Sequence, residues 1–138
     1  MTGKYFIDTN ILVYSIDSNY PKRKEQSRQL ISKLLKENSG VISTQVFQEF
    51  YYASVKKLHA DSIKVKNLLK YFEKFEVVQI NLPLIYEAID CSLTNKISFW
   101  DALIVVSAEY SSCSKIYSED LNNSQVIRGL EIINPFAN

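Results

Sequence analysis

Short apolar runs alternate with segments of helical periodicity along most of this 138-residue chain. The runs at residues 5–8, 41–43, 76–80, 115–118 and 129–133 have the length and composition of strands. Helices are predicted at 11–16, at 22–37, from 43 or 44 onward, after a cap at Asp61, at 82–93 and at 99–110. This alternation favours a parallel sheet with helices on both faces. We therefore expect an α/β fold in three layers, α/β/α, with a central, mostly parallel sheet and a single domain at residues 1–138.

The composition is that of an ordinary globular domain. Hydrophobic residues make up 46% of the chain, which suffices for a core without disulfides. Cys91 and Cys113 lie in or at the end of apolar helical segments, so we expect reduced core side chains. No apolar run reaches the roughly 20 residues needed to span a bilayer, and the N-terminus does not resemble a signal peptide. The predicted location is the cytoplasm.

The net charge limits how the chain can bind nucleic acid. At +1 it lacks the strong basic excess of a module that holds nucleic acid by bulk electrostatics. A nuclease remains compatible with this value, because an acidic site lowers the sum.

Four acidic residues fall at the ends of predicted elements. Asp8 closes the first strand, Glu49 lies on a helix, Asp101 opens a helix and Asp120 follows a late strand. In a parallel sheet such positions meet at one edge. Two carboxylates about 5 Å apart repel by roughly 3 kcal/mol at an effective dielectric near 20. A divalent cation is the usual compensation, and carboxylates with water suit Mg²⁺ or Mn²⁺.

Taken singly, each acid also has a structural explanation. Asp8 can cap a helix or form a turn, and Glu49 can be a solvated helix residue. Asp101 stands three residues after Ser98, as in a capping box, and Asp120 can be an ordinary loop carboxylate. Only the joint arrangement of the four indicates a site.

Other site chemistries fit the sequence poorly. A single histidine, His59, excludes a histidine-based zinc site, and two cysteines 22 positions apart make no zinc motif. The three glycines form no phosphate-binding loop. Any metal is therefore expected to be a hard cation, as one or two ions.

The chain resembles the PIN domain, and specifically the VapC-type toxins of toxin–antitoxin pairs. The resemblance begins at FIDTNILVYSID, continues through ISTQVFQEFYYA and SFWDALIVVSA, and ends with YSEDLNNSQVIRGLEIINPF. It implies a PIN-like fold and a metal-dependent endoribonuclease that hydrolyses RNA phosphodiester bonds, with tRNA or another structured RNA as substrate. It maps Asp8, Glu49, Asp101 and Asp120 as catalytic residues and metal ligands. It also implies a cognate antitoxin and a homodimer.

Polar residues beside these acids are candidates for supporting them. Thr9, Asn10 and Ser118 occupy such positions. The sequence departs from the family after Asp120: Asn123-Ser124 stands where members often carry an acidic residue and a glycine, which affects the expected shape of this loop.

Contacts to RNA are less clearly indicated. Lys22, Arg23 and Lys24 form a short basic run that binds a phosphate backbone or is simply solvated. Lys56-Lys57 closes the helix of Glu49 and leaves the same two options open. Most aromatic residues are expected in the core, but one exposed tyrosine of the 50–52 cluster could stack an unpaired base.

Three other readings compete. A haloacid-dehalogenase-like phosphatase needs D-x-D, which Asp8-Thr9-Asn10 does not provide. A receiver-like phospho-switch would need its lysine at Lys115, which begins a strand and so lies at the wrong end. A non-catalytic PIN-like module that binds RNA or protein is the main alternative, and acids at all four positions argue against it.

Overall fold

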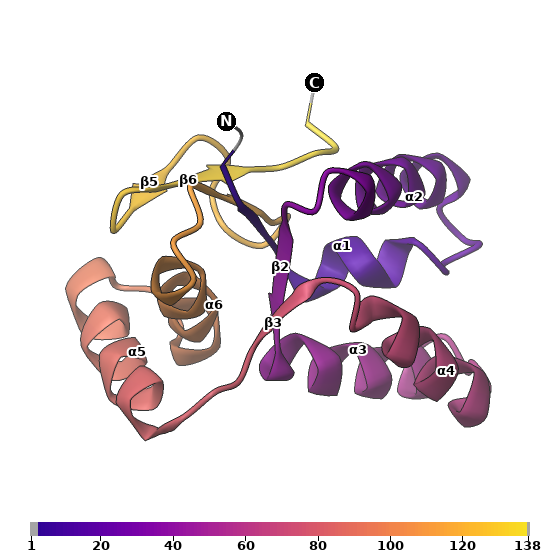
Figure 1. Ribbon diagram of the computed structural model, residues 1–138, viewed down its shortest axis with the longest axis horizontal. Helices are drawn as coiled ribbons and strands as arrows, with labels where there is room; N and C mark the ends of the chain where they lie inside the picture. Colours follow the sequence, from indigo (N-terminus) through magenta and orange to yellow (C-terminus); the bar gives the residue numbers. More distant parts are fainter. Residues whose placement is uncertain (1–2, 138) are drawn as a thin grey trace.

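The computed structural model of the protein describes residues 3–137, which form a six-stranded sheet between two layers of helices (Figure 1). The strands are β1 (Tyr5–Ile7), β2 (Gly40–Ser43), β3 (Glu76–Val78), β4 (Lys115–Tyr117), β5 (Val126–Ile127) and β6 (Leu130–Ile133). The helices are α1 (Thr9–Tyr14), α2 (Pro21–Lys36), α3 (Thr44–Lys56), α4 (Ser62–Phe72), α5 (Leu82–Asn95) and α6 (Phe99–Tyr110). The order in the sheet is β3-β2-β1-β4-β6-β5, and every neighbouring pair is parallel except β5 and β6. The predicted three-layer α/β/α fold is confirmed.

The helices divide between the two faces of the sheet. In Figure 1, α5 and α6 lie together on the left, and α1, α2, α3 and α4 lie on the right. Helix α6 packs on β2, β4 and β6, and α5 packs on α6. Helix α6 lies between the sheet and α5, and all seven of its residues from 102 to 108 are buried. A helix that is apolar nearly all round must be covered on several sides.

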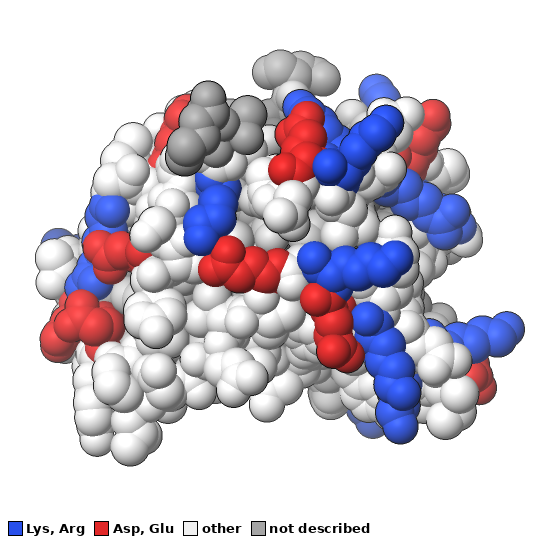
Figure 2. All heavy atoms as spheres, in the orientation of Figure 1, with Lys and Arg blue, Asp and Glu red and all other residues white. Residues whose placement is uncertain are grey.

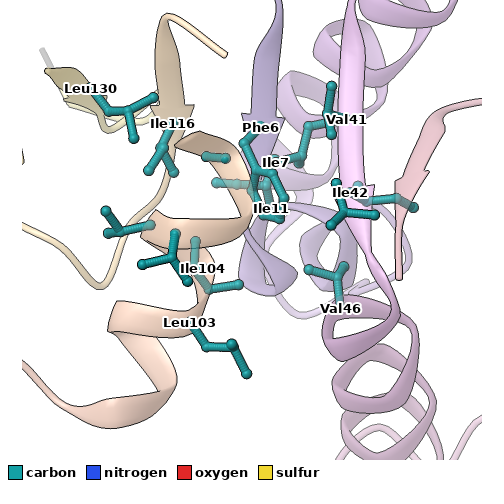
Figure 3. Close-up of a cluster of buried hydrophobic side chains, with 14 of the residues drawn as sticks. Phe6, Ile7, Ile11, Val41, Ile42, Val46, Leu103, Ile104, Ile116 and Leu130 are labelled. Carbon is teal, nitrogen blue, oxygen red and sulfur yellow. The ribbon is translucent and has the colours of Figure 1, made fainter. Parts of the chain in front are cut away.

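The core forms around the central strand β1. Phe6 and Ile7 are both fully buried, although neighbouring strand residues point to opposite faces. Both faces of the sheet are therefore covered, as a parallel sheet requires. Figure 3 shows these side chains between Ile42 of β2 and Ile104 of α6.

Helix boundaries follow recognisable caps. Asp61 accepts a hydrogen bond from the Lys64 amide at the start of α4, as predicted. The first helix starts two residues earlier than predicted, at Thr9, because Asp8 leaves the strand and caps it. The 76–80 run is a strand only to Val78.

Strand β5 was not predicted, because two residues are too few to show a periodicity. It pairs with β6 through a turn at Arg128 and Gly129, whose φ angles are +50° and +80°. Positive φ at both positions is that of a type I′ hairpin turn. Among residues 3–137, no helix has both the length and the hydropathy needed to cross a membrane.

Candidate functional site

Two neighbouring strands bring the first acid and its main partner together. Strands β1 and β4 are parallel, with Ile7 opposite Tyr117. The next residue on each strand, Asp8 and Ser118, therefore lies at the same carboxyl edge. The Ser118 hydroxyl donates to Oδ2 of Asp8 over 2.8 Å. Both side chains are buried, so this hydrogen bond is shielded from solvent.

Asp8 has a second role as the cap of α1. Its Oδ1 accepts from the Thr9 amide over 2.7 Å, and the residue is only 4% exposed. The pKa of Asp8 is raised from 3.8 to about 7, chiefly by burial; the hydrogen bonds from Ser118 and Thr9 oppose this rise, and the charges of Asp120 and Glu49 add to it. A carboxylate in this position is costly to ionise unless a cation balances it. The capping role and a ligand role are thus compatible.

Glu49 is held on the opposite wall by two donors. Thr9 Oγ1 donates to its Oε1 over 2.5 Å, and Gln45 Nε2 donates to its Oε2 over 3.2 Å. Gln45 is one helical turn before Glu49, and Thr9 comes from α1. Glu49 is partly buried rather than freely solvated, and its position is fixed from two elements.

Asp120 follows β4 and is also held by hydrogen bonds. Asn10 Nδ2 donates to its Oδ1 over 2.7 Å. The Asp120 amide donates to Ser118 Oγ over 3.2 Å, so the same hydroxyl that contacts Asp8 also anchors this loop. The pKa of Asp120 is raised, chiefly by burial and then by the charge of Asp101. The two acids therefore repel each other across the site.

Asp101 lies in the first turn of α6. Its amide donates to the Ser98 hydroxyl over 3.0 Å, which makes Ser98 the cap. The capping box is only half formed, since within residues 3–137 the Asp101 carboxylate accepts no hydrogen bond. The carboxylate of Asp101 is therefore available to act as a ligand in the pocket.

All four acids line one pocket of about 660 Å³ between α3 and α6. The lining also includes Gln45, Gln48, Tyr52, Ala53, Lys57 and Trp100. None of the four acids forms an ion pair with any residue from 3 to 137. Uncompensated carboxylates that share a cleft are the donor set of a hard divalent cation, and in this respect the residues fit Mg²⁺ or Mn²⁺.

The carboxylates share the pocket without closing around one point. Over residues 3–137, no three His, Cys, Asp or Glu side chains are arranged so that they could hold one ion. Hydrogen bonds connect the acids in pairs instead. Thr9 donates to both Asp8 and Glu49, and Ser118 connects Asp8 to the backbone of Asp120.

The predicted supporting residues each take one acid. Thr9 donates to Glu49, Asn10 to Asp120 and Ser118 to Asp8. Ser124, where the family often has glycine, adopts φ +70°. This left-handed conformation is one that glycine adopts more readily than serine.

The basic run at the start of α2 lies outside this pocket. Arg23 pairs with Glu119 and donates to the Tyr14 hydroxyl over 2.9 Å. Lys24 contacts Ser18, and Lys22 is exposed. Arg23 therefore joins α1 and α2 to the loop that carries Asp120.

Several residues that line the pocket were not predicted from the sequence. Gln45, Gln48 and Trp100 line the cleft, although none stood out as a site residue. Their neighbours offered a signal: Gln45 precedes Glu49 by one turn, and Trp100 directly precedes Asp101. Tyr52 is the exposed tyrosine of its cluster that reaches the pocket, and Lys57 reaches it too.

Residues 5–128 match the family model of the PIN domain. The chain belongs to the PIN domain family. No curated protein matches the sequence.

Solved structures share this PIN fold at low sequence identity. A toxin–antitoxin complex from Klebsiella pneumoniae is 17% identical with a TM-score of 0.71, covering 96% of this chain and 98% of the other. VapC20 of Mycobacterium tuberculosis, described as a sarcin-ricin loop cleaving toxin, is 15% identical with a TM-score of 0.68, covering 83% and 88%. VapBC2 of Rickettsia felis, bound to a promoter DNA fragment, is 22% identical with a TM-score of 0.67, covering 93% and 96%.

Proposed function

We propose that this PIN domain protein is a Mg²⁺- or Mn²⁺-dependent endoribonuclease and the toxin of a VapC-type toxin–antitoxin pair. The observation that carries the proposal is the set of four carboxylates around one pocket, none of which forms an ion pair with any residue from 3 to 137. Repulsion and desolvation of these carboxylates destabilise the fold, and binding of one or two divalent cations would offset this destabilisation. Family membership and structural relatives described as toxins support the same reading.

Asp8, Glu49, Asp101 and Asp120 are the residues that would hold the metal. When bound, the ion makes a water acidic enough to attack at neutral pH and neutralises charge developing on the phosphate. Asp8 must be ionised to take part, and its proton leaves as a cation enters. The hydroxyls of Thr9 and Ser118 keep their carboxylates oriented.

Two protein partners follow from the proposal. The first is an antitoxin, in line with relatives crystallised as toxin–antitoxin complexes. The second is another copy of the chain. Helix α5 exposes Leu82, Tyr86, Ile89 and Leu93, which are between 42% and 73% exposed. Figure 2 shows mostly uncharged atoms over the lower left of the molecule, where Figure 1 places α5.

The spacing of the α5 stripe favours a helical partner. Steps of four, three and four residues are those of the a and d positions of a heptad, which pack against a helix with the same pattern. A second α5 provides that pattern, and a two-fold pair buries both stripes at once. Leu93→Lys should convert a dimer to a monomer in analytical ultracentrifugation, whereas Ile63→Lys, an exposed apolar position on α4, should not. A wild-type chain that sediments as a monomer contradicts the dimer.

Cleavage of RNA by the purified chain tests the activity. We expect a labelled RNA to be cut within its chain when Mg²⁺ or Mn²⁺ is present, and not when a chelator is present. Adding back metal should restore cleavage. RNA that is bound but never cut with either metal would instead favour the non-catalytic PIN-like binding module.

A further inference from the structure

Trp100 is the sole tryptophan of the chain, and it lies exposed at the rim of the acid pocket. It is 61% exposed, although a tryptophan is a large apolar residue that folding normally covers. Its ring packs edge-on against Phe99, with centroids 5.0 Å apart and an interplanar angle of 77°. The side chain is thus supported on one side and open on the other.

Gln45 ties this aromatic residue to the acids. Its Nε2 donates to the Trp100 carbonyl over 3.1 Å and to Glu49 Oε2 over 3.2 Å. Gln45 is 4% exposed, so this link between α3 and α6 is shielded from water. The rim at Trp100 is therefore held in register with the carboxylates.

The facing wall comes from α3. Glu49, Ala53 and Lys57 follow each other at steps of four residues and so share one face of the helix. The small Ala53 leaves room between the acid and the lysine. Tyr52, which is 62% exposed, lies beside this row and also lines the pocket.

Lys57 supplies a positive charge at the far end of this row. It makes no ion pair with any residue from 3 to 137. A ligand along the pocket would thus meet carboxylates, aromatic faces and one ammonium. A nucleotide has the matching parts, since its base stacks on an aromatic ring and its phosphate pairs with lysine. An apolar protein segment would leave the lysine and the carboxylates unmatched.

We propose that Trp100 is a stacking platform for an unpaired RNA base next to the scissile phosphate, with Tyr52 on the opposite wall and Lys57 at a neighbouring phosphate. The proposal rests on the proposed ribonuclease function and adds the residues that position the RNA beside the carboxylates. A base inside a duplex is stacked on both faces by its neighbours and offers no face to the ring, so an intact duplex should not bind there. Trp100 acts on substrate position, and the carboxylates remain the reacting site.

The single tryptophan makes the test direct. Wild-type protein in a chelator, where RNA stays intact, is titrated with a short single-stranded RNA while tryptophan fluorescence is recorded. We expect saturable quenching with this RNA and none with the same sequence as a duplex. Trp100→Ala should weaken binding about 5- to 100-fold, measured by anisotropy of a labelled RNA, and Trp100→Phe should retain most of it. Tyr110→Ala is the control, a similarly exposed aromatic residue at the end of α6 that does not line the pocket.

The outcomes separate this proposal from the parent one. Quenching with no metal-dependent cleavage would support the Trp100 stacking site and contradict the proposed ribonuclease activity. Cleavage with no quenching, and with KM unchanged in Trp100→Ala, would overturn the subsite and leave the ribonuclease. A fluorescence change that depends on protein concentration alone, without RNA, would also overturn it by placing Trp100 in a contact between copies.

Discussion

Ser118 donates a hydrogen bond to Asp8 across 110 positions of sequence, and the same oxygen accepts from the Asp120 amide. One buried hydroxyl thus joins the Asp8 carboxylate to the backbone of the loop that carries Asp120. The bond to Ser118 lowers the pKa of Asp8 against the larger effect of burial. Ser118 therefore controls how readily Asp8 ionises.

Replacing Ser118 with alanine should shift the pH profile of the enzyme. Without the donor, the pKa of Asp8 rises further above about 7, so the rise in cleavage rate with pH should move to higher pH. The fold should lose about 1–2 kcal/mol of stability, because buried partners are left unpaired. Ser111→Ala is the control, as it also removes a buried hydroxyl donor but lies at the end of α6. An unmoved pH profile in Ser118→Ala would refute the link.

The metal-free protein should lose stability as pH rises. The pKa of Asp8 is about 7 in the folded state, above its ordinary value of 3.8, so the folded state holds the proton more tightly. The stabilisation that protonated Asp8 gives the folded state is fully present below about pH 4 and is lost by about pH 7. Over this range the free energy of unfolding falls by no more than about 1.4 kcal/mol per pH unit. Millimolar Mg²⁺ or Mn²⁺ should recover stability above pH 7, where Asp8 is ionised.

Denaturant unfolding over this pH range, with and without metal, measures both effects. Asp8→Asn should flatten the pH dependence and remove the metal response. A wild-type chain that metal fails to stabilise above pH 7 contradicts the site.

Removing the hydroxyl of Thr9 should weaken the site through Glu49. Thr9→Val keeps the side-chain volume but loses the donor that lies 2.5 Å from Glu49 Oε1. We expect metal affinity or cleavage rate to fall about 10- to 100-fold, as for other groups that orient metal ligands. Thr9→Ser retains the hydroxyl and should restore most activity. Equal activity of the valine and serine variants, in a Mg²⁺ titration of cleavage, would show that the contact does not matter.

The strand order explains which parts of this site could be predicted. Asp8 and Asp120 follow strands of a parallel sheet, so their meeting at one edge depended only on the alternation of strands and helices. The hydrogen-bond donors could be predicted as sequence neighbours of the acids. Which donor contacts which acid could not be predicted. The Thr9 hydroxyl donates to Glu49, while only the Thr9 amide donates to the neighbouring Asp8, because α1 lies against α3 in the folded chain.

The aromatic rim was hidden for a different reason. Helix α6 is apolar nearly all round, which predicts burial for every member. Trp100 is exposed nonetheless, because it lies in the first turn of α6, where the helix lines the pocket. Periodicity does not distinguish the end of a buried helix from its middle.

Arg23 should contribute to stability. Its guanidinium pairs with Glu119 and lies 5.1 Å from the centroid of the Phe136 ring. Arg23→Met should lower the free energy of unfolding by about 1 kcal/mol, a value limited by the partial exposure of the pair. Lys22→Met, one position earlier and exposed, should leave it unchanged. If both variants are as stable as the wild type but bind RNA less tightly, the basic run acts in RNA binding instead.

Asp101 offers the most direct test of the metal-dependent nuclease. Its carboxylate accepts no hydrogen bond within residues 3–137, so Asp101→Asn removes charge from the pocket with little change in volume or packing. We predict that this variant melts at or slightly above the wild-type temperature in chelator, because one charge that repels Asp120 is gone, and that it loses Mg²⁺-dependent cleavage of RNA. Mg²⁺-dependent cleavage by Asp101→Asn at the wild-type rate would contradict the four-carboxylate site.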